Sequence, residues 1–283
     1  LDDINDIKYL RLPSSKLGHE IVKEDRIGDD HHGHMHHVDH DDDASLHTHH
    51  DPTELRYSVF FNLEDLKVGL TKPIYFPKKK HSSPLLPRQS AASVPFSLKQ
   101  LPNILKLFSL PQGSPEAKAA EFTLRMCESK TVMGEIRICA TSFESMLDFI
   151  RSIFGMENIG HGLTLLTTTF YNDSKTFFQN YTVLEVPKEI PTPKMVACHL
   201  MEFPYAVYGC HTQMSDRKVY KISLRGEKGD KVVAIAVCHM DTSEWEPNHP
   251  SFKALGFGPG MAPVCHFFPD ETNLLWLPST VPV

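Results

Sequence analysis

Four Cys-His dipeptides lie in the last third of this 283-residue chain: Cys198-His199, Cys210-His211, Cys238-His239 and Cys265-His266. Ten residues separate the first two dipeptides, twenty-six the second and third, and twenty-five the last two. Six Cys and seventeen His spread over the whole chain would rarely fall into this order by chance. Sulfur forms crosslinks and imidazole binds metals, so the pattern points to two chemistries in one domain.

The period of a β-strand gives these dipeptides a structural meaning. Adjacent residues of a strand point to opposite faces, so each dipeptide would send its sulfur one way and its imidazole the other. We expect the sulfurs to crosslink the core while the four imidazoles converge on a shared site. The alternative for any single histidine is a hydrogen-bonded core residue.

The spacing favours copper over zinc as the metal. Structural zinc sites usually have Cys or His pairs two to five residues apart, and no Cys-x-x-Cys is present. If the cysteines are oxidised, imidazoles remain as ligands, and imidazole without thiolate suits copper(II). The expected ligands are the four dipeptide histidines, with His249, in a loop rich in turn residues, as a fifth candidate.

Cysteine use indicates an oxidising compartment. Six cysteines fit three disulfides, and Asn172 and Asn180 each begin an N-glycosylation triplet that is usable only in the secretory path. Cys127 and Cys139 lie outside the dipeptides, and we expect them to bond to each other across a local hairpin. The four dipeptide cysteines then form two bonds, for which three connectivities are open.

Composition excludes some partners. A net charge of -6 argues against nucleic acid. The chain has no run of 18 apolar residues, so we expect no transmembrane helix and no membrane partner. Because it begins at Leu1 without Met, we expect a mature or truncated form.

The chain divides into a tail and a domain. Residues 1–56 are acidic and poor in apolar residues, which predicts a disordered tail. Within the tail, residues 31–50 contain nine His, and such tracts bind copper, nickel or zinc loosely or act as solvated spacers. Residues 57–283 are expected to fold.

Residue periodicity predicts an α+β fold that is β-rich, with a few helices in its N-terminal half and disulfide crosslinks. Helices are expected over residues 96–108, 115–126 and 142–154, the last capped by Ser142 and stopped by Gly155. Residues 78–95 are expected to form a loop. Predicted strands cover residues 58–61, 163–171, 178–186, 195–199, 206–210, 218–224 and 231–238. The last of these is apolar on both faces and should be central, after a hairpin turn at residues 225–230.

These motifs resemble those of the BURP-domain proteins of plants, a family defined by four Cys-His dipeptides near the C-terminus. The short first spacing and the two spacings near 25 match without a gap, and so do Phe60-Phe61 and Ala236-Val-Cys-His239. The resemblance covers about residues 57–278 and leaves out the His-rich tail.

The resemblance implies two classes of function. Some members resemble copper-dependent peptide cyclases, which use dioxygen to oxidise a Tyr or Trp of a core peptide and join it to another residue. The core peptide is often N-terminal in the same chain. Other members are noncatalytic seed, stress or cell-wall proteins that bind polysaccharide or a partner enzyme. Both classes imply the secretory pathway, with the apoplast or a vacuole as destination.

We take the cyclase as the leading hypothesis because all four dipeptide histidines are intact. Tyr9 is the only Tyr or Trp before residue 57, so it is the candidate substrate in cis. A separate precursor peptide in trans is also open, and Tyr9 is otherwise a simple tail residue. Trp245 and Trp276 are expected to be packing residues. The noncatalytic protein is the second hypothesis, and metal buffering by the His-rich tract is a third.

Overall fold

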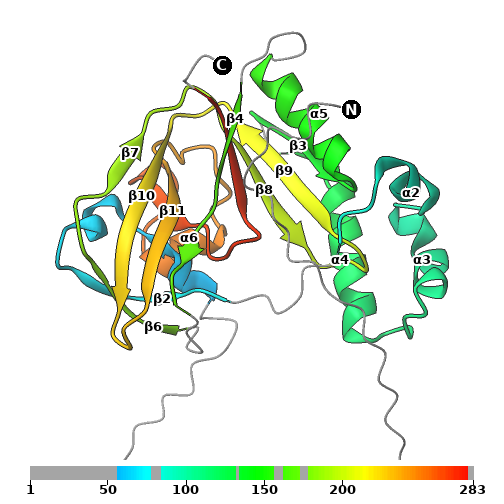
Figure 1. Cartoon of the computed structure of the whole chain (residues 1–283), viewed down its shortest axis with the longest axis horizontal. Coiled ribbons are helices and arrows are strands. Elements are labelled where there is room, and N and C mark those ends of the chain that lie inside the picture. The colour runs from blue at the N-terminus through cyan, green and yellow to red at the C-terminus, as the bar shows by residue number, and fades with distance from the viewer. Residues whose placement is uncertain (1–55, 78–83, 132–133, 156–161, 173–177, 280–283) are drawn as a thin grey trace, which may run out of the picture. The chain divides into compact units, whose positions relative to one another are not determined.

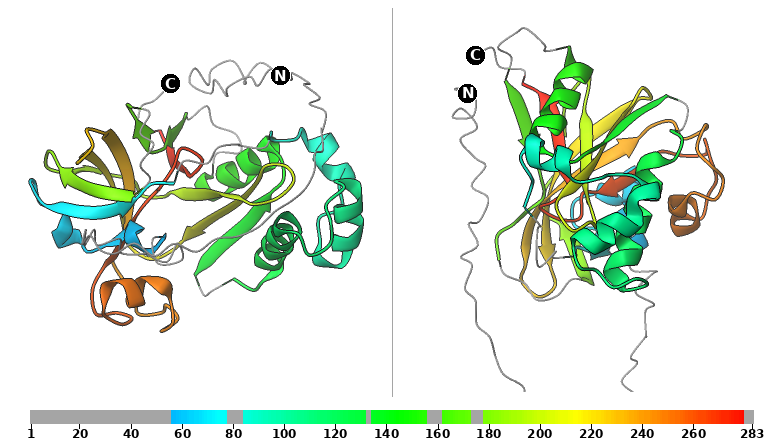
Figure 2. Two further views of the ribbon diagram at one scale, coloured as in Figure 1. Left: turned by 90° about the horizontal axis from the view of Figure 1, so that it is seen from below. Right: turned by 90° about the vertical axis from the view of Figure 1, so that its right-hand side faces the viewer.

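The structure is a computed structural model that describes residues 56–77, 84–131, 134–155, 162–172 and 178–279. All of them belong to one compact unit, which contains two antiparallel sheets and a set of helices (Figures 1 and 2). Residues 1–55 of the predicted tail lie outside the described residues. Within the described ranges, no helix has the length and apolar character needed to cross a membrane.

The helices lie mostly before the strands in the chain. The α-helices are α2 (Arg88–Ser93), α3 (Leu101–Leu107), α4 (Pro115–Glu128), α5 (Phe143–Phe154) and α6 (Pro250–Leu255). Within the described ranges they are accompanied by the 3-10 turns η2 (Arg56–Val59), η3 (Leu63–Leu66) and η4 (Leu98–Gln100). The fold is therefore α+β and β-rich, as the sequence predicts.

Helix α5 shows how local sequence sets an element. The hydroxyl of Ser142 accepts a hydrogen bond from the Ser145 N–H, and Ser145 returns one to the Ser142 backbone, which together form a capping box. Gly155 ends the helix in the left-handed region at φ 71°. Between these ends Met146, Phe149 and Ile150 are buried against the second sheet.

The first sheet has the order β1-β12-β11-β10-β6-β2, with β5 also paired to β11 and β7 to β10. Its strands are β1 (Phe60–Phe61), β2 (Thr71–Tyr75), β5 (Thr169–Phe170), β6 (Phe178–Val183), β7 (Lys188–Ile190), β10 (Arg217–Gly226), β11 (Lys231–His239) and β12 (Val264–Phe267). Strand β11 is central, as expected from its two apolar faces. The predicted hairpin turn closes with the Gly226 N–H donating to the Asp230 carbonyl at 2.8 Å.

The second sheet has the order β3-β9-β8-β13-β4. Its strands are β3 (Glu135–Ala140), β4 (Leu163–Leu166), β8 (Val196–Met201), β9 (Val207–Gln213) and β13 (Leu274–Pro278). Helix α5 covers one face of this sheet, and a further apolar cluster joins α3 and α4 to the start of β9.

A shared apolar layer lies between the two sheets. Val219 and Ile235 of the first sheet pack there with Ala197 and Leu275 of the second. Alternate residues of the same strands point outward, so that Cys238 and Cys198 belong to separate outer clusters. Each sheet thus has an inner face toward the other sheet and an outer face away from it.

Several local predictions differ from the structure. The loop predicted over residues 78–95 contains α2, and the strand predicted over 58–61 is a 3-10 turn followed by the two residues of β1. The strand predicted over 163–171 is divided into β4 and β5. Helix α6 and the strands β3, β7, β12 and β13 are additional elements.

Candidate functional site

The first two dipeptides lie on neighbouring strands of the second sheet. Cys198 of β8 and Cys210 of β9 face each other in register and form a disulfide with Cα atoms 4.0 Å apart. The next residue of each strand points to the inner face, so His199 and His211 become diagonal neighbours there. Their Nε2 atoms lie 3.3 Å apart. We call these two residues the β8–β9 pair.

The last two dipeptides repeat this arrangement in the first sheet. Cys238 of β11 and Cys265 of β12 are in register and form a disulfide with Cα atoms 3.9 Å apart. His239 and His266 are again diagonal on the inner face, with Nε2 atoms 3.4 Å apart. We call them the β11–β12 pair. The division between outward sulfur and inward imidazole that the strand period predicts is therefore present in both sheets.

Polar side chains orient the β8–β9 pair. Nδ1 of His199 lies 2.7 Å from Oδ1 of Asn273, and the amide nitrogen of Asn273 donates to Asp270, which fixes the orientation of the amide. Nδ1 of His211 lies 3.2 Å from a carboxylate oxygen of Glu135. The proton of His199 therefore lies on Nδ1 and its Nε2 presents a lone pair, whereas Nδ1 of His211 is buried without a hydrogen-bond partner among the described residues.

Aromatic rings surround the β11–β12 pair. Trp245 lies edge-on to His239 with ring centroids 4.9 Å apart, and Phe268 stacks on His266 at 5.6 Å. Burial lowers the pKa of His266 to about 4. Burial also lowers the pKa of His239 well below its usual value, and repulsion from His266, His211 and Arg217 adds to this effect. Nδ1 of His239 is buried without a hydrogen-bond partner among the described residues.

The two pairs approach each other on the inner faces of the sheets. Phe268 contacts His199 at 5.5 Å as well as His266, so one ring joins the two pairs. The pKa values of both His239 and His266 are lowered by His211 of the other pair. Among the described residues, however, no three His, Cys, Asp or Glu side chains converge closely enough to hold one metal ion. The four imidazoles are therefore grouped as two neighbouring pairs rather than around one point.

Each pair fits a metal ion. Two imidazole nitrogens that are each about 2.0 Å from one ion at a tetrahedral angle lie about 3.3 Å apart. In the β8–β9 pair the two Nε2 atoms lie 3.3 Å apart, a spacing that matches two ligands of one ion. Donors that are all neutral imidazoles suit copper or zinc better than magnesium or calcium.

His249 adjoins the β11–β12 pair in a different role. It caps α6, because its Nδ1 accepts a hydrogen bond from the Ser251 N–H at 3.3 Å. Its ring lies 4.5 Å from Trp245 and 6.1 Å from Phe60. Its Nδ1 is thus used by the helix, which leaves only Nε2 for a ligand role.

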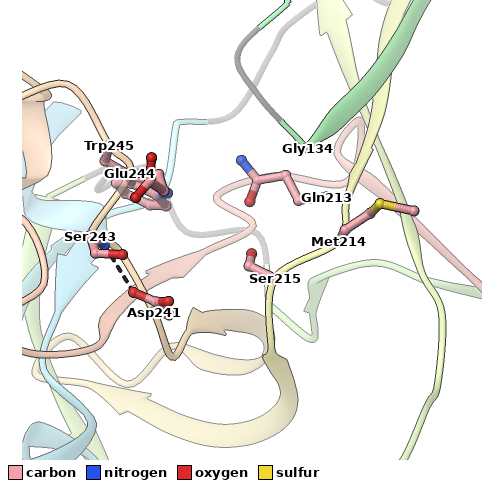
Figure 3. Close-up of a pocket in the computed structure, with 8 residues that line it drawn as sticks. All are labelled: Gly134, Gln213, Met214, Ser215, Asp241, Ser243, Glu244 and Trp245. Carbon is pink, nitrogen blue, oxygen red and sulfur yellow. Dashed lines mark hydrogen bonds between the residues drawn. The ribbon is translucent and has the colours of Figure 1, made fainter.

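A groove of about 240 Å³ lies between the end of β9 and the segment that follows β11 (Figure 3). One wall is the end of β9, from Gln213 to Ser215, with Gly134 next to it. The other wall is the segment after β11, from Asp241 to Trp245. Figure 3 shows the Gln213 amide pointing across the groove toward Glu244 and Trp245.

The chain matches the BURP domain family model over residues 59–278. It belongs to the BURP domain family. It is 42% identical over 223 residues to the BURP domain-containing protein BNM2A of Brassica napus, covering 77% of this chain and 79% of that protein. BURP domain protein USPL1 of Arabidopsis thaliana is 41% identical over 226 residues, with the same coverage. Protein RAFTIN 1B of Triticum aestivum is 41% identical over 221 residues, which cover 77% of this chain and 59% of that protein.

All six cysteines of this BURP protein are oxidised, which indicates a secretory-type environment. The predicted bond between Cys127 and Cys139 is present, with Cα atoms 5.7 Å apart. It joins α4 to β3, so the expected local hairpin is wrong. Of the three open connectivities, the structure has Cys198–Cys210 and Cys238–Cys265.

Other predicted positions of the BURP protein fall outside the site or outside the described residues. Asn180 is exposed on β6, and its amide donates to Glu227. Asn172 is exposed, but the rest of its glycosylation triplet lies outside the described residues. So do Tyr9 and the His-rich tract.

Sequence reasoning missed four side chains of the BURP site. Trp276 is a buried packing residue as expected, but Trp245 contacts the metal-ligand candidates and lines the groove. No sequence motif marks the other three positions, which are Glu135, Asn273 and Arg217. Only the position of Arg217, directly opposite His239 in the β10–β11 ladder, places it at the site.

Proposed function

We propose that this protein is a copper-dependent oxidative peptide cyclase that joins a Tyr or Trp side chain of a core peptide to another residue. The observation that carries the proposal is the approach of two imidazole Nε2 atoms to 3.3 Å, repeated at 3.4 Å in a second imidazole pair. His199 and His211 would hold one ion and His239 and His266 another, with His249 nearby. Bound copper would supply one-electron oxidation of the substrate by dioxygen.

The reaction balances as an oxidative coupling. The peptide loses two hydrogen atoms as the new bond forms, and dioxygen takes up two electrons and two protons to give hydrogen peroxide. The core peptide is in this chain, with Tyr9 as the reacting phenol, or in a separate precursor peptide. The site of action is the secretory pathway, leading to the apoplast or a vacuole.

The side chains around the pairs prepare the ligands. Asn273 holds the imidazole of His199 in the tautomer that leaves Nε2 free, and the carboxylate of Glu135 lies beside Nδ1 of His211. Burial keeps His239 and His266 unprotonated in mildly acidic solution, so both remain available as ligands. Trp245 shields His239 from water.

The proposal is tested by mass spectrometry. The metal-free protein is incubated in air with copper(II), digested, and searched for a peptide that has lost two hydrogens. We expect the loss in the peptide that contains Tyr9. Zinc(II) is the matched control, because it takes the same ligands without redox chemistry and should give no loss. The variant His239→Ala should also show none.

An absence of mass loss, both in the Tyr9 peptide and in any supplied core peptide, would contradict the proposal. The second candidate would then stand: a noncatalytic protein that binds cell-wall polysaccharide or a partner enzyme. The noncatalytic function is favoured by the arrangement of the ligand candidates. Among the described residues they form pairs, and no three of them converge on one point.

A further inference from the structure

We propose that the groove between β9 and the segment after β11 binds residues 7–13 of this same chain. Docking there would bring Tyr9 to the two histidine pairs. The inference rests on the proposed function for the chemistry that follows, but the docking itself requires no metal.

The groove adjoins both pairs through the chain and through contacts. Gln213 lies two residues beyond His211 on the same face of β9, and Asp241 lies two residues beyond His239. Trp245 forms part of the groove wall and touches His239. A ligand in the groove therefore lies next to at least one ligand candidate of each pair.

The groove is acidic and offers an unused acceptor. Asp241 and Glu244 are exposed on its wall, and none of its lining residues is basic. The backbone N–H of Ser243 donates to the Asp241 carboxylate at 2.9 Å and orients it on the groove wall. Oε1 of Gln213 is buried and accepts no hydrogen bond within the described part of the chain. Such a groove suits a basic peptide with N–H groups to donate.

Trp245 adds an apolar component. Its indole is half-buried and lies on the groove wall that faces Gln213. An aromatic ring or a guanidinium group packs favourably on an indole. The groove therefore suits a segment that combines an aromatic residue with positive charge.

One segment of this acidic chain has that composition. Between Asp6 and Glu20 there is no acidic residue, whereas Lys8, Arg11 and Lys16 are basic. Tyr9 stands between the first two of these. A local charge of +3 in a chain of net charge -6 is complementary to Asp241 and Glu244.

The chain is long enough for this docking to occur within one molecule. Forty-four residues separate Arg11 from Arg56, the first described residue. At up to about 3.3 Å per residue, they span at most on the order of 150 Å. The covalent link would raise the effective concentration of the segment at the groove.

The first test is zero-length crosslinking of the metal-free, full-length protein with a carbodiimide, which joins a lysine to a carboxylate that it touches. We expect an amide between Lys8 and Asp241 or Glu244 that forms within the monomer. In 1 M salt this crosslink should be suppressed, because the Debye length falls to about 3 Å and the charges are screened. Lys8 joined only to carboxylates outside the groove, or joined to the groove only in crosslinked dimers, would overturn the inference.

The second test measures affinity. In the full-length variant with Lys8→Glu and Arg11→Glu, the tail should no longer occupy the groove. A labelled peptide of residues 4–16 is then titrated with this variant, and binding is followed by fluorescence anisotropy. Adding Asp241→Asn and Glu244→Gln should weaken binding about tenfold, since two attractions are lost without giving the acidic tail a basic groove. The matched control adds Glu202→Gln and Glu227→Gln, at exposed positions outside the groove, and should leave binding unchanged. Equal binding by the two sets would contradict the docking.

The two proposals fail in different ways. If the groove variants lose peptide binding but the protein never shows the two-hydrogen mass loss with copper, docking stands and the cyclase does not. If Asp241→Asn with Glu244→Gln leaves the mass loss at Tyr9 unchanged, the cyclase stands and the docking is wrong.

Discussion

The β8–β9 pair and the β11–β12 pair share one backbone design and differ in their surroundings. In both, an in-register disulfide on the outer face sets two imidazoles diagonally on the inner face. Asn273 and Glu135 hold the first pair by hydrogen bonding and charge, whereas the second pair lies among aromatic rings. The difference teaches that the dipeptide sets ligand position, while residues from other strands set ligand chemistry.

The residues opposite the imidazoles differ as well. Gly209 lies opposite His199 and Ala197 opposite His211, whereas Val264 and Val237 occupy the matching places in the other pair. The side chain of His211 is 30% exposed, whereas His239 is only 6% exposed. We therefore expect the β8–β9 pair to be the more accessible to a metal ion and the β11–β12 pair the drier.

The largest effect on stability is expected when the disulfides, two of which the pairs share as a design, are reduced. Reducing the disulfides of the metal-free protein should lower the free energy of unfolding by about 3 kcal/mol for each bond, because loops of 12, 12 and 27 residues are released. Thermal unfolding with and without dithiothreitol measures this. An unchanged melting temperature would show that the bonds do not support the fold.

The stability of the protein should depend on pH through the buried β11–β12 pair. The folded-state pKa of His266 is about 4, below its usual 6.5, so the unfolded chain binds more protons between these values. Stability is fully present above pH 6.5 and is lost as the pH falls toward 4, by about 3 kcal/mol for this one group. Urea unfolding of the metal-free protein at several pH values, compared with His266→Gln, measures it. Identical pH profiles for the two proteins would refute this origin.

The charged support of the β8–β9 pair should affect metal affinity. Glu135→Gln removes the carboxylate beside His211 and should weaken copper binding at that pair by about 10- to 100-fold. Copper affinity at the β11–β12 pair should be unaffected. Adding His239→Ala to the Glu135→Gln variant removes binding at that pair, so that the affinity of the β8–β9 pair can be measured alone. Competition with a chelator of known affinity measures both. Equal weakening at the two pairs would mean that they form one site.

The smallest effect is expected at the aromatic wall. Trp245→Leu removes the ring contacts with His239 and His249 and should cost on the order of 1 kcal/mol of stability. Trp245→Phe keeps an aromatic ring and is the matched control. Denaturant unfolding compares them, and a larger loss in the phenylalanine variant would contradict the role assigned to the ring.

The parts of the fold that depend on local signals could be predicted from the sequence. Helix α5 follows from Ser142 and Gly155, and the turn before β11 follows from its glycines. Alternation along a strand was enough to separate sulfur from imidazole. Strand order was not predictable, because Cys238 meets Cys265 only through a pairing across 27 residues that no local signal specifies.

The surroundings of the site could not be predicted for the same reason. Glu135 precedes His211 by 76 residues and Asn273 follows His199 by 74, so both reach the site only through strand pairing in the second sheet and the turn before β13. Trp245 resembles an ordinary loop residue until its contacts with His239 are known. The groove is also a product of tertiary structure, since its walls follow strands of different sheets.

Copper content tests the central claim most directly. The full-length protein and a variant with His199, His211, His239 and His266 all changed to Gln are loaded with copper(II), dialysed and analysed for metal by mass spectrometry. The tail is identical in both, so the difference reports the two pairs alone. Two ions fewer in the variant, and one fewer when only one pair is changed, is the predicted result. No difference between the two proteins would contradict copper binding by the paired imidazoles.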